Sequence, residues 1–151
     1  MEDTIPNSRG IYEYQYPRPA VTADVVVLSA DRKEILLIRR KNDPYKGCWA
    51  FPGGFLNMDE TLEQCARREL QEETSLVLAD IYPVGTYSTV DRDPRGRVIT
   101  TAYYTSVKKE DVNPKADDDA AEIGWFSLDS LPPLAFDHEE ILADAILLVR
   151  N

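Results

Sequence analysis

Glycine, arginine and glutamate recur at fixed spacing between residues 54 and 76, and this pattern constrains the chain more than any other feature of its sequence. The spaced residues are Gly54, Glu60, Arg68, Glu69, Leu70, Glu72 and Glu73. If the segment forms a helix, residues three and four positions apart lie on one face. The apolar side chains of Leu62, Cys65, Ala66 and Leu70 then form a stripe, and Glu69 and Glu73 project from its middle.

Carboxylates on the apolar side of a helix need a physical explanation. A buried carboxylate is costly unless it is protonated, paired or bound to a cation. Oxygen ligands on adjacent helical turns suit a hard divalent ion, so Glu69, Glu72 and Glu73 are candidate ligands for Mg²⁺ or Mn²⁺. The alternative is a solvated acidic face, which is the usual explanation of acidic runs. Gly54 and Arg68 also stand at fixed spacings from these glutamates, which a solvated acidic face does not require, and this disfavours the alternative.

The segment resembles the signature of the Nudix hydrolase family, G-x5-E-x7-R-E-U-x-E-E-x-G-U, where U is a bulky aliphatic residue. The match runs from Gly54 to Leu76, and the departure is Ser75, where the family has glycine. A left-handed backbone is common just past a helix end, so serine there costs some stability but removes no ligand. The resemblance implies an α/β Nudix fold with a mixed sheet between helices. We expect residues 20–151 to form this domain and residues 1–19 to be an N-terminal extension.

The resemblance also implies a reaction, the attack of water on a phosphorus of a nucleoside diphosphate linked to another moiety. Clustered Mg²⁺ neutralises the charge that develops in such a reaction. Arg68 is expected to pair with Glu60 or Glu72 and to hold the carboxylates in register; the alternative is an ordinary surface pair with Glu72. Gly53 and Gly54 let the backbone approach metal and phosphate closely, or adopt unusual dihedral angles.

The general base is left open by the sequence. Within the family this role falls on a glutamate of the signature, here Glu69, or on an acid in a later loop. The acids of the later loop are Asp117, Asp118, Asp119 and Glu122. Loop acids are usually solvated, but Glu122 adjoins the strand expected at residues 123–126 and could face the site.

Basic and aromatic residues outside the signature are candidates for substrate contacts. The basic residues are Arg39, Arg40, Lys41 and Lys46 before it and Arg92, Arg95 and Arg97 after it. The alternative is that these basic residues offset the negative charge of nearby acidic residues. Residues 87–97 resemble the segment after the signature in small ADP-ribose pyrophosphatases and in Nudix-type regulators that sense ADP-ribose. A nucleotide base could stack on Trp49, Phe51 or Tyr87, although buried aromatic residues more often belong to the core. For His138 we expect a place in the first turn of the last helix, capped by Asp137, with a substrate contact as the alternative.

Composition limits the remaining possibilities. The chain has 151 residues, of which 43% are hydrophobic, enough for one domain with a real core. The net charge of −10 argues against a nucleic-acid partner. Two cysteines give no disulfide framework and favour the cytoplasm. Residues 1–19 lack the pattern of a signal peptide, and no apolar run approaches the length of a membrane span.

The order of elements follows from runs and breaks in the sequence. Expected strands lie at residues 23–30, 34–38, 49–56, 81–90, 98–107 and 123–126, with helices from about Leu62 and over 139–149. The first two strands should form a hairpin, and the third should be broken at residues 52–54. Residues 39–47 and 108–119 are expected to be loops.

Three functions remain open. The favoured one is a Mg²⁺-dependent hydrolase of ADP-ribose or a related nucleoside diphosphate sugar. The alternatives are an ADP-ribose-sensing Nudix regulator, which often lacks signature glutamates and carries a winged helix, and a housecleaning hydrolase of modified nucleoside triphosphates.

Residues 11–19 look too short for a sheet of their own, yet their tyrosines favour an interface. We expect a homodimer built on this segment, as in the enzymes that the chain resembles; the alternative is that the segment covers its own sheet edge.

Overall fold

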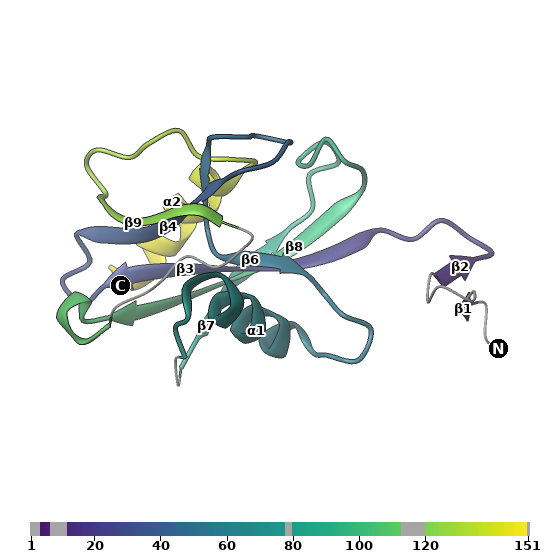
Figure 1. Cartoon of the computed structure of the whole chain (residues 1–151), viewed down its shortest axis with the longest axis horizontal. Helices are drawn as coiled ribbons and strands as arrows, with labels where there is room; N and C mark the ends of the chain where they lie inside the picture. Colours follow the sequence, from purple (N-terminus) through teal and green to yellow (C-terminus); the bar gives the residue numbers. More distant parts are fainter. Residues whose placement is uncertain (1–3, 7–11, 78–79, 113–119, 151) are drawn as a thin grey trace.

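A mixed seven-stranded sheet with one helix on each face forms the body of the protein (Figure 1). The computed structural model describes residues 4–6, 12–77, 80–112 and 120–150. The strands of this sheet are β3 Ala20–Ser29, β4 Glu34–Arg40, β5 Trp49–Ala50, β6 Gly53–Phe55, β7 Tyr82–Tyr87, β8 Val98–Val107 and β9 Ala120–Ser127. The helices are α1 Leu62–Thr74 and α2 His138–Val149, with a short 3-10 turn η1 at Lys109–Asp111. The predicted α/β architecture with a mixed sheet between helices is confirmed.

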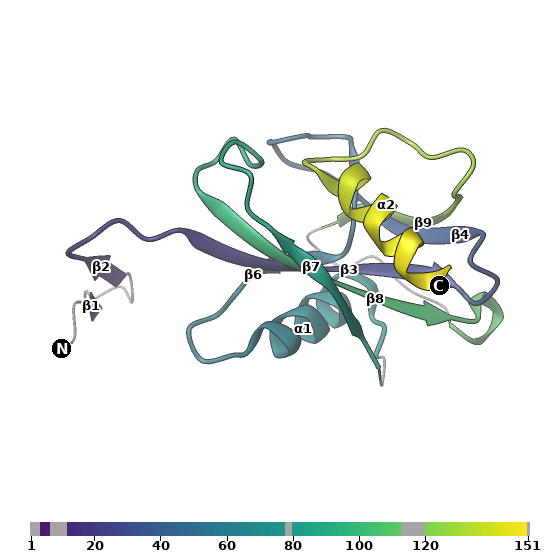
Figure 2. The same ribbon diagram turned by 180° about the vertical axis from the view of Figure 1, so that it is seen from behind.

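The central strand β3 explains the two-layered core. It pairs in parallel with β8 and antiparallel with β4 and β6. Successive side chains of a strand point to opposite faces, so Ala23, Val25 and Val27 pack with α1, whereas Val26 and Leu28 pack with α2. Both faces are therefore buried, which is why the sequence of this strand is a continuous apolar run. Figure 2 shows α1 and α2 on opposite sides of β3 from behind.

Several boundaries differ from those expected. The hairpin of β3 and β4 is confirmed, but β4 continues to Arg40, because Arg39 and Arg40 pair with β9. They are therefore strand residues and not part of the basic loop. The break at residues 52–54 lies earlier than predicted, because Gly53 and Gly54 belong to β6 and pair with β3. The strand expected at 81–90 ends at Tyr87, and residues 109–111 of the expected polar loop form η1.

Helix α1 begins and ends as its sequence predicts. Thr61 and Gln64 form a capping box, in which the Thr61 side chain accepts from the Gln64 N–H and the Gln64 side chain accepts from the Thr61 N–H. These bonds satisfy two backbone donors of the first turn. At the other end, Ser75 has φ 64° and ψ 10°, a left-handed conformation, and its N–H donates to the Gln71 carbonyl. Serine therefore occupies the backbone conformation that glycine adopts at lowest cost.

We expect Ser75→Gly to stabilise the protein by about 0.5–1 kcal/mol. A left-handed conformation costs an L-residue about 1–2 kcal/mol, and the greater freedom of glycine in the unfolded chain offsets part of that gain. Ser75 is exposed, so no packing is lost. Urea unfolding measures the change, with Ser130→Gly as the matched control at an exposed site without positive φ. The control should be slightly destabilised, and an equal loss in Ser75→Gly would contradict the expectation.

Residues 11–19 contribute one strand to a small N-terminal sheet, because an earlier segment of the chain supplies the second strand. Strands β1 Thr4–Pro6 and β2 Tyr12–Tyr14 pair antiparallel. Figure 1 shows this pair apart from the main sheet, beyond the N-terminal end of β3. The Tyr14 hydroxyl lies 4.0 Å from the sulfur of Met58, which is on the loop leading into α1.

None of the helices in the described ranges has the length and apolar character needed to cross a membrane.

Candidate metal and phosphate site

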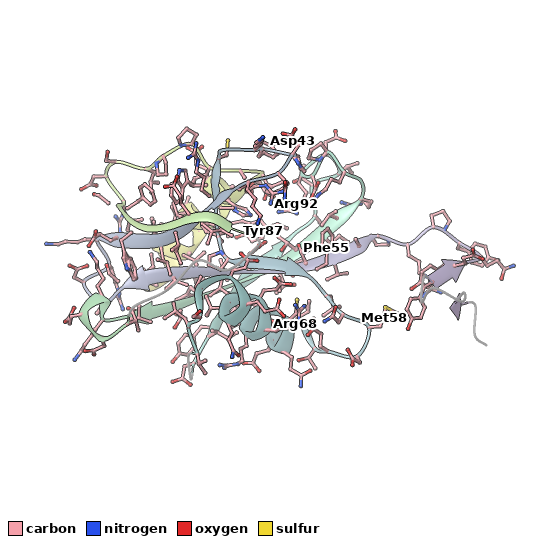
Figure 3. The ribbon with its side chains drawn as sticks, in the orientation of Figure 1. Asp43, Phe55, Met58, Arg68, Tyr87 and Arg92 are labelled. Carbon is pink, nitrogen blue, oxygen red and sulfur yellow. The ribbon has the colours of Figure 1, made fainter. Side chains whose placement is uncertain are left out.

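A cleft of about 420 Å³ lies between β3, β6, α1 and the N-terminal end of α2. Its volume is within the range of small-molecule sites. Acidic residues of the lining are Asp24, Glu69, Glu73 and Asp93; basic residues are Arg40, Lys41, Arg92 and Arg95; Phe51, Phe55, Phe136 and His138 supply rings. In the view of Figure 3, Phe55 lies between Arg68 on α1 and Arg92 on the loop after β7. The cleft thus brings a carboxylate cluster and a basic group together.

Glu69 and Glu73, one turn apart on α1, form the carboxylate cluster. Glu73 is only 6% exposed, and its Oε2 has no hydrogen-bond partner. Burial raises the pKa of Glu73 to about 10, and the hydrogen bond and charge of Glu69 contribute further. A buried, orphaned carboxylate oxygen beside a second carboxylate is what a cation would satisfy. The two residues therefore fit a divalent metal ion.

Gly53 and Gly54 make this arrangement possible by lacking side chains. A Cβ on Gly54 would lie 2.5 Å from Cδ of Glu69, and a Cβ on Gly53 would lie 2.4 Å from the carbonyl oxygen of Ala23. The Gly53 N–H donates a hydrogen bond to Glu73. Neither glycine has a positive φ. Of the two reasons that the sequence offered for this pair, close approach therefore applies and unusual dihedral angles do not.

Arg68 binds three glutamates at once. Its guanidinium donates to Glu60 at 2.6 and 2.9 Å, to Glu69 at 2.7 Å and to Glu72 at 3.2 Å. It also donates to the Phe55 carbonyl at 3.0 Å. The Arg68 hydrogen bonds, with help from the Asn57 N–H, lower the pKa of Glu60 to about 2, and Glu60 in turn raises the pKa of Arg68. Arg68 therefore pairs with both predicted partners and also ties Glu69 to them; its catalytic role stays a prediction.

Glu72 is placed differently from the other two predicted ligands. Its side chain is 53% exposed, and it is not part of the cleft lining. Within the described ranges, no three histidine, cysteine, aspartate or glutamate side chains are grouped as metal ligands. Glu69 and Glu73 converge because they are four residues apart, whereas Glu72 lies at the edge of the stripe and faces Arg68.

The basic wall of the cleft is formed by Arg40, Lys41 and Arg95. The Arg95 guanidinium lies over the rings of Phe55 and Phe136, 4.9 and 5.4 Å from their centroids, and Asp93 holds it at 2.7 Å. Arg40 lies 5.1 Å from the Phe136 centroid, and burial, followed by the charge of Arg95, lowers its pKa. This wall places positive charge in the same cleft as Glu69 and Glu73, in a protein whose net charge is −10.

The other predicted arginines have protein partners. Arg92 is buried and makes two hydrogen bonds to Asp137, of 2.8 and 2.6 Å. Asp137 occupies the N-cap position of α2, but its side chain makes no capping bond, so our expectation of a capping aspartate was wrong. Arg97 donates to the Ser88 carbonyl and does not line the cleft.

Glu122 and Arg39 form an exposed ion pair of 2.9 Å on neighbouring strands. Neither residue lines the cleft. Asp117, Asp118 and Asp119 lie outside the described residues. The aromatic candidates belong to the core beside α2, where Trp49 packs on Phe126 and Phe51 is 2% exposed. The hydroxyl of Tyr87 donates to Asp144.

Asp24, His138 and Thr100 form a polar group at the site that sequence reasoning did not identify as one. The Thr100 hydroxyl donates to Asp24 at 2.6 Å, and Nε2 of His138 lies 3.9 Å from the same carboxylate oxygen. A signal was present in the sequence, because Asp24 is a carboxylate inside an otherwise apolar, β-branched run. Such a residue needs a partner or a function when the strand is buried.

A family model described as NUDIX domain matches residues 18–145. The chain belongs to the Nudix family. ADP-ribose pyrophosphatase of Methanocaldococcus jannaschii is 47% identical over 137 residues, covering 90% of this chain and 79% of that protein. The ADPR responsive transcriptional repressor NtrR of Acinetobacter baylyi is 33% identical over 142 residues, 90% of this chain and 56% of the repressor. The Nudix domain of Shewanella oneidensis NrtR, solved with ADP ribose, has a TM-score of 0.82 at 30% identity, covering 89% of this chain and 90% of that one. The predicted family and the Nudix fold are confirmed.

Proposed function

We propose that this Nudix protein is a divalent-metal-dependent pyrophosphohydrolase that cleaves ADP-ribose to AMP and ribose 5-phosphate. The observation that carries the proposal is the cleft itself, which is lined both by Glu73, with its orphaned Oε2 beside Glu69, and by the basic wall. A phosphoanhydride needs both features, because its oxygens carry charge before cleavage and more of it as the bond breaks. The 47% identity to an ADP-ribose pyrophosphatase supports this substrate.

Mg²⁺, with Mn²⁺ as a substitute, suits the donor set. Glu69 and Glu73 supply hard carboxylate oxygens, and Gly54 brings backbone against Glu69. A divalent ion bound there supplies charge neutralisation and polarises the phosphate oxygens. Glu72 remains a proposed ligand that would have to leave Arg68 and turn toward the cluster.

The side chains of the cleft divide the remaining tasks. Arg40 and Arg95 bind the diphosphate, while Arg92, through Asp137, fixes the loop that carries Arg95. Water attacks one phosphorus, a phosphorus–oxygen bond to it forms, and the bridging oxygen leaves with its phosphate. The proton of the attacking water passes to a carboxylate. Glu69 is the candidate base that lines the cleft, whereas Glu122 is paired with Arg39 outside it.

A substrate panel tests the proposal. We expect kcat/KM to be higher for ADP-ribose than for 8-oxo-dGTP, NADH or diadenosine polyphosphates, with AMP and ribose 5-phosphate as products. Product analysis by chromatography in the presence of Mg²⁺ measures this. A tenfold or greater advantage for a nucleoside triphosphate would support the housecleaning alternative and reject the ADP-ribose assignment.

The regulator alternative rests on the similarity to NtrR and NrtR. A sensing domain binds ADP-ribose without turning it over, so calorimetric binding combined with single-turnover kinetics separates the two functions. We expect turnover, because Glu60, Glu69, Glu72 and Glu73 are all present. Tight binding of ADP-ribose with no product after prolonged incubation with Mg²⁺ would favour the regulator.

We also propose that the protein is a homodimer in which residues 11–19 form the interface and contribute to the substrate pocket. An isolated two-stranded sheet is marginally stable in water, and β1 and β2 form such a sheet with Tyr12 42% exposed. Tyr16 is 63% exposed. Tyrosines of this kind are enriched at interfaces. A second chain would cover them.

Light scattering at micromolar concentration tests the dimer. A single species near 17.1 kDa would contradict it. If the partner completes the pocket, deletion of residues 1–16 should abolish dimerisation and raise the KM for ADP-ribose together.

We place the protein in the cytoplasm, since Cys48 and Cys65 are both free thiols. Fractionation of cells that contain the protein checks this location.

A further inference from the structure

Asp24 is a carboxylate in the middle of the buried central strand β3. It is 7% exposed and lines the cleft. One of its oxygens, Oδ2, is held by protein: the Thr100 hydroxyl donates to it at 2.6 Å, and Nε2 of His138 faces it at 3.9 Å. Thr100 is fully buried on β8, the parallel neighbour of β3. A hydrogen bond from β8 therefore fixes this side of the carboxylate, and the His138 ring of α2 lies beyond it.

The His138 ring has a defined orientation. It stacks on Phe51 with a centroid distance of 4.3 Å and an interplanar angle of 8°. Its Nδ1 accepts the Phe51 backbone N–H at 3.2 Å, so the proton of the neutral ring is on Nε2, toward Asp24. Burial lowers the pKa of His138, which keeps this neutral form at neutral pH. The Nε2–H of His138 therefore lies on the side of Asp24, at a distance of 3.9 Å that is too long for a direct hydrogen bond.

The other oxygen of Asp24 lies against the backbone of β6. Asp24 pairs with Gly53 in the β3–β6 register, and a Cβ on Gly53 would lie 2.2 Å from Oδ1. The Gly53 N–H in turn donates to Glu73. Gly53 therefore separates Asp24, whose strand position faces α2, from Glu73, which comes from α1. Because Gly53 has no side chain, the two carboxylates approach the same part of the cleft from opposite sides of the sheet.

Asp24 is not a third direct ligand in this arrangement. Among the residues that the structure describes, no three acidic, histidine or cysteine side chains are grouped closely enough to share an ion. Glu73 provides independent evidence of a ligand at this place, since its Oε2 is buried without a hydrogen-bond partner and the residue lines the same cleft as Asp24. A fixed carboxylate near a cation but outside its first coordination sphere acts through the water molecules that surround the ion.

We propose that Asp24 is a positioning residue whose Oδ1 accepts a hydrogen bond from the hydration shell of the divalent ion held by Glu69 and Glu73. The Thr100 hydroxyl fixes Asp24 for this purpose by its hydrogen bond to Oδ2. The proposal rests on the proposed function, because it assumes an ion at Glu69 and Glu73. It goes beyond that function by assigning to β3, far from the signature in sequence, a share in metal binding and in the placement of water.

The experiment compares Asp24→Asn with Asp93→Asn and Thr100→Val. Asparagine keeps the shape of Asp24 but offers a donor where the carboxylate accepts. Asp93 is a matched control, because it is equally buried in the same cleft and its loss changes the charge by the same amount, but Arg95 occupies it. Thr100→Val removes the donor to Asp24 and nearly preserves the shape of a residue that does not line the cleft.

Mn²⁺ affinity is measured by electron paramagnetic resonance of the free ion, without substrate, and kcat and KM are measured with ADP-ribose. We expect Asp24→Asn to weaken Mn²⁺ binding by about 10- to 100-fold and to lower kcat by a similar factor, with KM changed much less. Thr100→Val should weaken Mn²⁺ binding by about threefold to tenfold, the effect of one hydrogen bond. Asp93→Asn should leave Mn²⁺ affinity within about twofold, while its KM rises because Arg95 is released.

Parent-like Mn²⁺ affinity in folded Asp24→Asn would overturn the proposal. An increase in KM alone would also overturn it, since Asp24 would then contact the substrate. If Asp24→Asn does not fold, the Mn²⁺ affinity of Thr100→Val decides. The metal site and the role of Asp24 can be rejected separately. Full activity in Glu73→Gln would reject the metal site itself. An inactive Glu73→Gln with a parent-like Asp24→Asn would reject only the role of Asp24.

Discussion

Replacing Glu73 with glutamine is expected to lower kcat by about 10²-fold or more while the protein remains folded. That factor corresponds to about 2.7 kcal/mol of lost transition-state stabilisation, as expected when a ligand of a catalytic metal is removed. Glutamine matches the carboxylate in size but carries no charge, so its amide oxygen is a much weaker ligand for a divalent ion. Glu63→Gln is the matched control on the same helix, where Glu63 is 56% exposed and paired with Arg67. The control should retain full activity.

The same variant should gain stability when metal is absent. Because burial raises the pKa of Glu73 from 4.5 to about 10, the folded protein keeps a proton that the unfolded chain loses above about pH 4.5. The metal-free parent therefore loses stability as the pH rises from about 4.5 toward 10, and Glu73→Gln does not. Thermal unfolding in EDTA should show the variant more stable at pH 8 and the difference vanishing near pH 4. Parent-like turnover in the folded variant, or a variant less stable at pH 8, would contradict the assignment.

We expect Gly54→Ala to impair metal binding and Gly53→Ala to destabilise the fold. At Gly54 the new Cβ meets the carboxylate of Glu69, the mobile end of a side chain. The carboxylate can move away, so the fold survives, but the pair with Glu73 is broken. We expect metal affinity and kcat to fall by about 10- to 100-fold or more, with little change in unfolding free energy.

At Gly53 the new Cβ meets backbone instead, at 2.4 Å from the Ala23 carbonyl oxygen and 2.9 Å from Cα of Asp24. The pairing of β3 with β6 must open, which should destabilise the protein by about 1–3 kcal/mol or more. Gly85→Ala is the control, since its Cβ would have ordinary contacts of 3.7 Å. Urea unfolding and calorimetric titration of Mg²⁺ separate the two effects. A Gly54→Ala protein with normal metal affinity would show that Glu69 does not need its present position.

Local features of the chain were predictable because short-range physics decides them. The capping box at Thr61 and Gln64 determines where α1 begins, and the spacing of Glu69 and Glu73 places both on one face of it. The continuous apolar run of β3 indicated a strand buried on both sides. The left-handed residue after α1 was also expected, because a helix end commonly needs one there and the family has glycine at this position.

Other outcomes depended on neighbours that are remote in sequence. Arg92 lines the cleft and donates two hydrogen bonds to Asp137, 45 residues later, and its contact with substrate stays a prediction. Glu122 lies beside Arg39 because β9 pairs with β4, and its role as a base stays a prediction. An ionic side chain has no sequence periodicity that reveals its partner, so composition alone could not predict either ion pair.

The sequence by itself determined the family and the carboxylate pair on α1, because both follow from local spacing along one element, and the resemblance to the family implied the α/β architecture. Tertiary structure alone decided which charges meet. It brings Asp24 from β3, Thr100 from β8 and His138 from α2 to one point, and it leaves the Oε2 of Glu73 buried without a partner. The physical reason is that the charge of a buried group is decided by the groups packed around it, and strand pairing across the sheet selects those groups.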